Sequence, residues 1–206
     1  MLYPIQVLCD FVFPPTKHEL QLRAVSNERF IHWYHPHTVH EVTCLSEYQL
    51  PEVQAAIAAG KFEHSYHGAK LLATLVKPYL SSLPTKKTVL IPIPLSAKRL
   101  RERKFNQVER VLQYAKKPAH YHVVTNILMR TIETIPQTTL TRAKRLTNIT
   151  GAFAVQTKNL FYLDEIERVI ICDDVMTTGA TLHEAQSTLI PHLPKNVEVI
   201  CVAWAH

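Results

Sequence analysis

The sequence predicts an α/β protein in which helices flank a parallel twisted sheet, with a small irregular region at residues 1–50. Two apolar runs, Thr88–Ile93 and Val169–Cys172, have the length and continuity of strands buried on both faces of a parallel sheet. Segments with helical periodicity alternate with these runs, which is typical of β-α-β units. The chain has 206 residues, 47% of them hydrophobic, which is enough for one packed α/β domain at residues 51–206.

Helices are predicted where apolar residues recur at every third or fourth position. One helix begins near Pro51, a residue favoured in a first helical turn, and ends at Gly60. A second helix covers about 67–77, and Pro78 is expected to end it because proline lacks the N–H that a helix needs. The remaining predicted elements are strand 88–93, a helix at 106–116, short strands at 123–124 and 153–155, strand 169–172, a helix at 180–190 and strand 197–204.

Two adjacent carboxylates, Asp173 and Asp174, follow the second apolar run and precede a short loop of Thr, Gly and Ala that opens a helix. Ligands of open α/β sheets gather outside the carboxyl ends of such strands. The carboxylates can accept hydrogen bonds from a vicinal diol, and the loop offers backbone N–H groups and hydroxyls to a phosphate. The pattern predicts a ribose 5-phosphate site; the alternative is a buried strand with an acidic turn and a Thr-capped helix. The residues expected at the phosphate are Thr177, Thr178, Gly179, Ala180 and Thr181.

A basic segment follows the first apolar run, with five Lys and Arg side chains within seven residues. Arg99, Arg103 and Lys104 are expected to neutralise phosphate charge, since guanidinium groups pair with phosphate in a bidentate manner. Asn106 and Gln107 then open a helix, where asparagine is a favoured cap and backbone N–H groups point outward. The alternative for the arginines is a solvated helix face.

Three segments far apart in the chain together resemble the ComF/GntX family of phosphoribosyltransferase-like proteins, which is associated with competence and DNA uptake. They are Ile91-Pro92-Ile93-Pro94-Leu95 with the basic segment after it, a stretch from Arg130 to Phe153, and the Asp-Asp-Val-Met-Thr-Thr-Gly-Ala-Thr loop. The resemblance covers roughly residues 45–206. It implies a type I phosphoribosyltransferase fold, with residues 1–50 as a hood.

The resemblance also implies that phosphoribosyl pyrophosphate (PRPP) is the ligand. Asp173 and Asp174 would then hold the ribose hydroxyls as the catalytic pair, and would bind Mg²⁺ indirectly, through PRPP or water. The poorly periodic stretch 130–150 matches the position of a loop that closes over the ligand and excludes water. The residues of this loop expected to contact the ligand are Gln137, Arg142 and Arg145.

The sequence departs from the family at the zinc ribbon with which most members begin, because its 206 residues contain no C-x-x-C pair. They contain instead a run of four histidines and a cysteine. On a strand, His35 and His37 would share one face and His32 and His40 the other, so that the four could not converge on one ion. We therefore expect no zinc site. The run consists of His32, His35, His37, His40 and Cys44.

A second departure is Lys104, which replaces the glycine expected between Arg103 and Phe105. Lysine adds a charge at this position but removes backbone freedom.

The composition predicts a cytoplasmic protein. No run approaches the roughly 18 uninterrupted apolar residues of a membrane span, and the first 15 residues lack the basic start of a signal peptide. The four cysteines are scattered, so no disulfide framework is expected. The sequence leaves the oligomeric state open, and a dimer is compatible with it.

Two functions fit these observations. The first is an Mg²⁺-dependent enzyme that transfers phosphoribosyl from PRPP to a nitrogen nucleophile. The second is a non-catalytic module that uses the same pocket to bind a phosphosugar or single-stranded DNA. The net charge of +6 favours an anionic partner, although Phe105 is the only aromatic residue in the basic clusters. The resemblance implies a role in competence, with proteins of the competence machinery as partners, and leaves the chemistry open.

Overall fold

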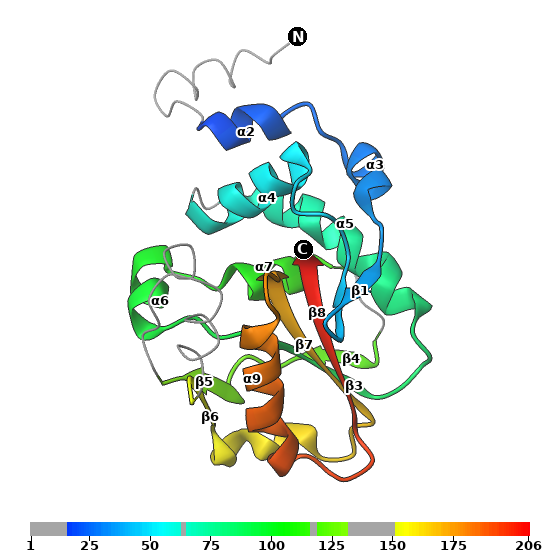
Figure 1. Ribbon diagram of the computed structural model, residues 1–206, viewed down its shortest axis with the longest axis vertical. Helices are drawn as coiled ribbons and strands as arrows, with labels where there is room; N and C mark the ends of the chain where they lie inside the picture. The colour runs from blue at the N-terminus through cyan, green and yellow to red at the C-terminus, as the bar shows by residue number, and fades with distance from the viewer. Residues whose placement is uncertain (1–15, 63–64, 116–118, 132–150) are drawn as a thin grey trace.

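The computed structural model describes residues 16–62, 65–115, 119–131 and 151–206, and a six-stranded sheet lies at its centre (Figure 1). The strand order is β1-β2-β8-β7-β3-β4, and every neighbouring pair is parallel except β1 with β2. This arrangement confirms the predicted fold class. The strands are β1 (His37–Val39), β2 (Val42–Cys44), β3 (Thr88–Pro92), β4 (Tyr121–Val123), β7 (Arg168–Val175) and β8 (Glu198–Ala205).

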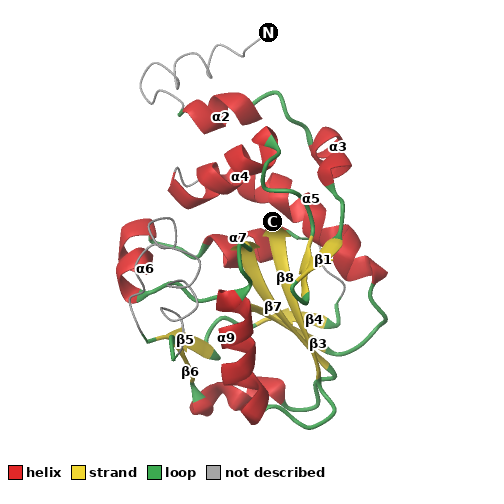
Figure 2. Ribbon diagram, in the orientation of Figure 1, coloured by secondary structure: helices red, strands yellow, loops and turns green. Residues whose placement is uncertain are grey.

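Helices form a layer on each face of the sheet, and a short antiparallel ribbon, β5 (Leu128–Arg130) with β6 (Phe153–Val155), accompanies them (Figure 2). The α-helices are α2 (Lys17–Leu22), α3 (Asn27–Phe30), α4 (Pro51–Phe62), α5 (Tyr66–Ser82), α6 (Ala97–Arg103), α7 (Gln107–Tyr114) and α9 (Ala180–Leu189). Short 3-10 helices are η1 (Ile31–Trp33), η3 (Thr157–Leu163) and η4 (Ile190–His192).

Side chains of β7 alternate between the two helical layers, as a strand requires. Ile170 and Cys172 are buried in one apolar cluster with residues of α4, α5 and α7. Val169 and Ile171 are buried in a second cluster with residues of α9, β5 and β6. The sheet therefore separates two halves of the core, and each residue of β7 belongs to one half.

The predicted strand at 169–172 is longer in the structure, since β7 continues through both aspartates to Val175. Its partner β3 ends where Pro92 lies opposite Cys172, but β8 remains paired with β7 as far as Val175 opposite Ala205. The two carboxylates thus stand within the end of the strand, and not in a turn after it. Pairing with β8 on one side is what keeps this segment extended.

The prediction that Pro78 ends a helix is wrong, because α5 continues to Ser82 with Pro78 inside it. A proline within a helix costs about 3 kcal/mol. Tyr79 and Leu80 beyond it are both buried, however, and they extend the apolar stripe of the helix into the core. The burial of these two side chains offsets the loss of one backbone hydrogen bond.

The region predicted to be irregular is ordered over its described part, residues 16–50. The Thr16 hydroxyl and the Glu19 carboxylate each accept a backbone N–H at the start of α2, which is a capping box. Further along, β1 and β2 form a hairpin whose turn residues, His40 and Glu41, both have positive φ. Because β2 pairs with β8, this hairpin is part of the main sheet.

Helix α4 lies beyond the carboxyl ends of β7 and β8, and α2 packs against α4 on its far side (Figure 1). An ion pair between Lys61 of α4 and Asp174 of β7 connects this layer to the sheet. None of the helices in the described part of the chain combines the length and the apolar character needed to cross a membrane.

Candidate functional site

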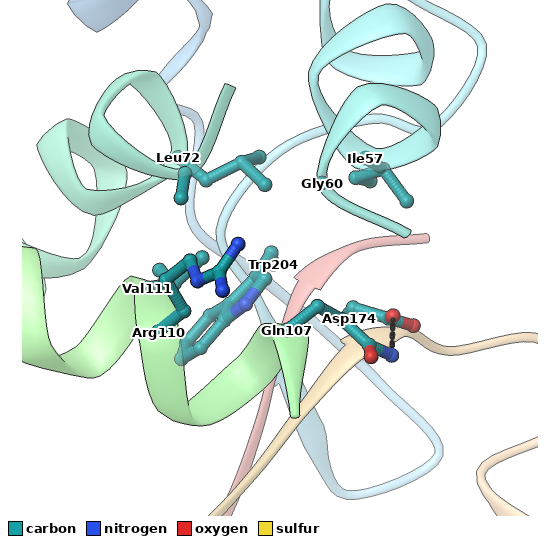
Figure 3. A pocket seen from close by; sticks show the side chains of 9 residues that line it. Ile57, Gly60, Leu72, Gln107, Arg110, Val111, Asp174 and Trp204 are labelled. Carbon is teal, nitrogen blue, oxygen red and sulfur yellow. Dashed lines mark hydrogen bonds between the residues drawn. The ribbon is translucent and has the colours of Figure 1, made fainter. Parts of the chain in front are cut away.

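Asp173 and Asp174 face different halves of the structure, because consecutive residues of a strand project to opposite faces. Asp173 lines a hollow together with the loop that connects β7 to α9. Asp174 lines a second hollow between α4, α5, α7 and the end of β8 (Figure 3). The two adjacent aspartates, which the sequence predicts to act together on one ligand, therefore line two different hollows.

Asp174 is buried and is held by two side chains. The Gln107 Nε2 group donates a hydrogen bond of 2.7 Å to its Oδ2, and the Lys61 ammonium lies 3.0 Å from its Oδ1 (Figure 3 shows the bond to Gln107). Gln107 is the first residue of α7 and Lys61 lies in the last turn of α4, so Asp174 connects both helices to the sheet. Each carboxylate oxygen still has a second lone pair for a ligand.

Asp173 is partly buried, and its environment disfavours the charged form. Burial, and then the neighbouring charge of Asp174, raise the pKa of Asp173 from 3.8 to about 7. The backbone N–H of Asp174, which donates to Asp173 Oδ1 at 2.8 Å, opposes this shift, as do the charges of Lys61 and Arg130. Near neutral pH, the two aspartates together thus carry between one and two negative charges.

Two arginines bring positive charge to the carboxylates. Burial lowers the pKa of Arg103, and the charge of Asp174 opposes this shift. Burial likewise lowers the pKa of Arg130, where the charge of Arg99 acts in the same direction and that of Asp173 opposes it. A guanidinium remains charged despite such shifts. Arg103 of α6 and Arg130 of β5 therefore act on the aspartates from two different elements, and Arg99 of α6 interacts electrostatically with both arginines.

The loop after β7 turns sharply at Gly179, which has φ 76° and immediately precedes α9. A Cβ added to Gly179 would lie 3.0 Å from the ring of His183, so both the backbone and the close approach favour glycine. Thr178 Oγ1 accepts a long hydrogen bond of 3.4 Å from the N–H of Ala180. Thr177, Thr178, Ala180 and Thr181 line the same hollow as Asp173. The loop thus brings hydroxyls and the start of a helix to one carboxylate.

Asn106 is the N-cap of α7, as its position in the sequence predicts. Its Oδ1 accepts the N–H of Val108 at 3.0 Å, and its Nδ2 donates to the carbonyl of Ile93 at 2.8 Å. These two bonds fix the start of α7 against the turn after β3. Asn106 therefore positions Gln107, and through it Asp174.

Lys104 adopts a left-handed conformation, φ 64°, at the end of α6. This is the conformation that a glycine adopts without strain, which explains why the substitution noted in the sequence matters. The Lys104 side chain is exposed, and the backbone N–H of Lys104 donates a hydrogen bond of 2.8 Å to the carbonyl of Leu100.

Two residues of the site are not predicted from the sequence, and three predicted residues lie outside the part of the chain that the structure describes. Lys61 belongs to no motif and stands more than a hundred residues before Asp174, so only the tertiary structure reveals their pairing. Trp204 lines the second hollow, and the sequence predicts only that it belongs to a strand. The predicted loop residues Gln137, Arg142 and Arg145 lie outside the described residues.

The histidine run extends from His32 in η1 to Cys44 at the end of the β1–β2 hairpin. His37 lies with its ring centroid 6.0 Å from that of His35 and 6.2 Å from that of His206. The carbonyl of His40 lies 2.8 Å from His183 Nε2 in α9, and Cys44 is buried in β2. Within the described parts of the chain, no group of three His, Cys, Asp or Glu side chains is arranged to hold a metal ion.

The fold and the site define an α/β protein with paired carboxylates and a Thr/Gly loop at the carboxyl edge of a mainly parallel sheet. No family model matches the chain. Over 107 residues, 52% of this chain and 40% of the relative, it is 32% identical to competence protein ComFC of Bacillus subtilis (strain 168). Over 137 residues, 63% of this chain and 58% of the relative, it is 31% identical to competence protein F of Haemophilus influenzae. The chain is thus similar in sequence to two competence proteins, which confirms the resemblance seen in its motifs.

The matched part of the chain spans about half the length of these curated relatives, between 40% and 58%. Among solved structures, an allosteric regulatory enzyme of purine biosynthesis overlaps 85% of this chain and 30% of that chain, at 12% identity and a TM-score of 0.34. A score this low carries no argument about the fold.

Proposed function

We propose that the chain binds PRPP, or another ribose 5-phosphate, at the carboxyl edge of the sheet. The observation that carries this proposal is the hollow shared by Asp173 and the loop from Met176 to Thr181. A carboxylate at one end of this hollow can accept hydrogen bonds from ribose hydroxyls. The hydroxyls of the loop and the start of α9 at the other end suit the 5-phosphate. The diol and the phosphate of one ribose would thus be bound by a single segment.

The charges around the carboxylates support an anionic ligand with more than one phosphate. Arg103 and Arg130 interact electrostatically with the aspartates, Arg99 interacts with these two arginines, and Lys61 is paired with Asp174. Two carboxylates alone would repel PRPP, and these cations reverse that effect. Arginine is well suited to the pyrophosphate because it forms two parallel hydrogen bonds to phosphate oxygens.

Mg²⁺ is compatible with this donor set when it arrives on the ligand. Mg²⁺ sites commonly combine one or two carboxylates with substrate phosphates and water. Asp173 and Asp174 provide two carboxylates at the sheet edge, and Lys61 already compensates the charge of the second one. Bound there, Mg²⁺ would neutralise charge on the pyrophosphate and polarise it as a leaving group.

Transfer of the phosphoribosyl group to a nitrogen nucleophile is the reaction that this ligand would permit. The residues named above would act by positioning PRPP and stabilising the charge of the departing pyrophosphate. The relatives are named competence proteins, and this supports a role of the reaction or of the binding event in competence.

A second candidate function is the binding of single-stranded DNA or of a phosphosugar without chemistry. It is favoured by α6, in which the structure buries no side chain and whose residues Lys98 and Arg101 are exposed. The aromatic residue of this segment, Phe105, lies under the guanidinium of Arg110 at 3.3 Å, so its ring is already covered on one face. Base stacking on Phe105 is therefore restricted, which favours the first function.

One experiment distinguishes the two. The protein is incubated with PRPP, Mg²⁺ and a panel of bases and amines, and release of pyrophosphate is measured beside binding of single-stranded DNA. Release that depends on an acceptor supports phosphoribosyl transfer. DNA binding without PRPP binding or turnover would replace our proposal with the second function.

A further inference from the structure

A groove runs along the outer face of α5, with α3 and η1 on one side and α7 on the other. Its volume is about 610 Å³, which lies within the range of about 300–1,000 Å³ typical of ligand pockets. Buried Ala73 and half-buried Ile31 and Tyr114 give the lining an apolar part. Neither Asp173 nor Asp174 belongs to this lining. The groove is therefore a second space, separate from the candidate ribose 5-phosphate site.

Two exposed lysines give the groove a positive charge. Lys70 and Lys77 both belong to α5 and stand seven residues apart, which is about 10.5 Å along a helix. Among the residues that the structure describes, the lining holds no acidic side chain, and neither lysine forms an ion pair. The groove is thus complementary to a ligand that carries two negative charges.

A backbone acceptor lies between the two lysines. Pro78 of α5 has no N–H, so it cannot donate a hydrogen bond to the carbonyl of Thr74, four residues earlier. Thr74 and Pro78 both line the groove and are both half-buried. The carbonyl of Thr74 therefore lacks the hydrogen bond that a regular helix supplies, and an N–H of a ligand in the groove can replace it.

This combination favours a peptide over a nucleic acid. A peptide carries backbone N–H donors together with side-chain carboxylates, whereas the sugar-phosphate backbone of DNA has no N–H to offer. Proteins that bind single strands typically stack bases on aromatic rings. In the described lining the aromatic ring is that of Tyr114, and the Lys70 ammonium already lies 5.5 Å from its centre. The rest of the apolar lining is aliphatic, which suits an aliphatic side chain.

We infer that the groove binds an extended acidic segment of a partner protein, with the pattern acid–x–apolar–x–acid. Alternate residues of an extended chain face the same side, so its two acids stand about 13 Å apart. The flexible stems of Lys70 and Lys77 accommodate the difference from their own spacing and pair with these acids. The apolar side chain covers Ala73 and Pro78, and a backbone N–H of the segment donates to the carbonyl of Thr74. The inference does not depend on PRPP binding.

The test uses the peptide Gly-Glu-Ser-Leu-Ser-Glu-Gly, blocked at both ends, and the same peptide with glutamine in place of both glutamates. Each is titrated into the nitrogen-15-labelled protein, and the backbone amide signals of the groove are followed. We expect saturable shifts with the first peptide and at least tenfold weaker binding of the second. Equal affinity for both, or no shift with either, overturns the inference. A thymidine decamer that shifts the same signals at lower concentrations than the acidic peptide would overturn the choice of a peptide over a nucleic acid.

A charge-reversal variant provides the second arm. Lys70→Glu with Lys77→Glu should weaken binding of the acidic peptide at least tenfold. The matched control, Lys158→Glu with Lys195→Glu, changes the net charge equally at exposed positions outside the lining and should leave the affinity within twofold. Equal losses in the two folded variants contradict a specific site. If the first variant fails to fold, the comparison of the two peptides on the unaltered chain still decides the question.

Pro78→Ala tests the backbone acceptor, because alanine restores the N–H that pairs with the carbonyl of Thr74. The variant should remain folded, since alanine favours a helix, and should bind the acidic peptide at least threefold more weakly. Unchanged peptide affinity would contradict the use of this carbonyl. PRPP titrated into Lys70→Glu with Lys77→Glu should bind as it does to the unaltered protein, so that a failure of this inference is distinguishable from a failure of the ribose 5-phosphate proposal.

Discussion

The ammonium of Lys61 lies 3.0 Å from Oδ1 of Asp174, and this pair joins α4 to the last residues of β7. Both side chains are largely removed from water, with 21% and 10% exposure. The pair therefore places a cation against Asp174 at the edge of the sheet, whereas burial raises the pKa of its neighbour Asp173 to about 7. One aspartate is fixed by protein partners, and the other faces the phosphate loop.

Replacing Lys61 tests the structural part of this relationship. Lys61→Met should lower the free energy of unfolding by about 1–3 kcal/mol, between the values for exposed and for fully buried ion pairs. The matched control is Lys87→Met, whose pair with Glu165 is 64% and 82% exposed and should contribute almost nothing. Urea denaturation measures both. If both substitutions lower the free energy of unfolding equally, the ion pair between Lys61 and Asp174 does not stabilise the contact between α4 and β7.

The raised pKa of Asp173 predicts a pH dependence of stability. Because burial raises the folded-state pKa to about 7 from 3.8, the folded protein binds more protons than the unfolded chain between these values. The contribution of Asp173 to stability is thus fully present below pH 4 and is lost as the pH rises towards 7. Asp173→Asn should remove this decline, so that its stability relative to the unaltered protein increases from pH 4 to pH 8. Parallel pH profiles in urea denaturation would contradict the shift.

Gly179 is expected to tolerate substitution worse than another glycine with the same backbone conformation. Alanine in the left-handed region costs about 1–2 kcal/mol, and this applies equally to Gly179 and Gly151, with φ 76° and 73°. At Gly179 a Cβ also meets the His183 ring at 3.0 Å, whereas at Gly151 it meets nothing within 4 Å. Gly179→Ala should therefore be the more destabilising of the two by thermal denaturation. If Gly151→Ala is the more destabilising substitution, the His183 side chain moves away from the added Cβ without a loss of stability.

The Lys and Arg side chains of α6 are expected to form two groups, one that binds PRPP and one that does not. Arg103 interacts with Asp174, and Arg99 interacts with Arg103 and with Arg130, so Arg99→Ala with Arg103→Ala should weaken PRPP binding at least tenfold. Lys98 and Arg101 are exposed, and replacing both with Ala should leave PRPP binding unchanged. If α6 also contacts DNA, the second pair should reduce the slope of log affinity against log salt by about 1–2. PRPP affinity that responds equally to both pairs would contradict the division.

The sequence predicts the sheet and its main helices because uninterrupted apolar runs and helical periodicity are local signals. It fails at Pro78, where the burial of Tyr79 and Leu80 outweighs a local rule. It also fails in residues 16–50, since the hairpin is stabilised by pairing with β8, which lies far away in the sequence. Local composition cannot indicate such a partner.

The candidate site likewise has one part that the sequence predicts and another part that only the tertiary structure reveals. The loop from Thr177 to Thr181 is a contiguous pattern, and the structure gathers it around Asp173 as a single hollow. The surroundings of Asp174 come from three elements, and no spacing in the chain links Lys61, Gln107 and Trp204. The two aspartates face different hollows because β7 continues through both of them to Val175, and a strand places consecutive side chains on opposite faces.

Calorimetric titration with PRPP and Mg²⁺ tests the central claim most directly. Each aspartate is expected to contribute a charge-assisted hydrogen bond worth about 1.5–3 kcal/mol. The double variant Asp173→Asn with Asp174→Asn should therefore bind PRPP at least tenfold more weakly than the unaltered protein. Asp164→Asn, at an exposed position just before β7, should bind it equally well. Unchanged PRPP affinity in a folded double variant would contradict the assignment of this site to a ribose 5-phosphate.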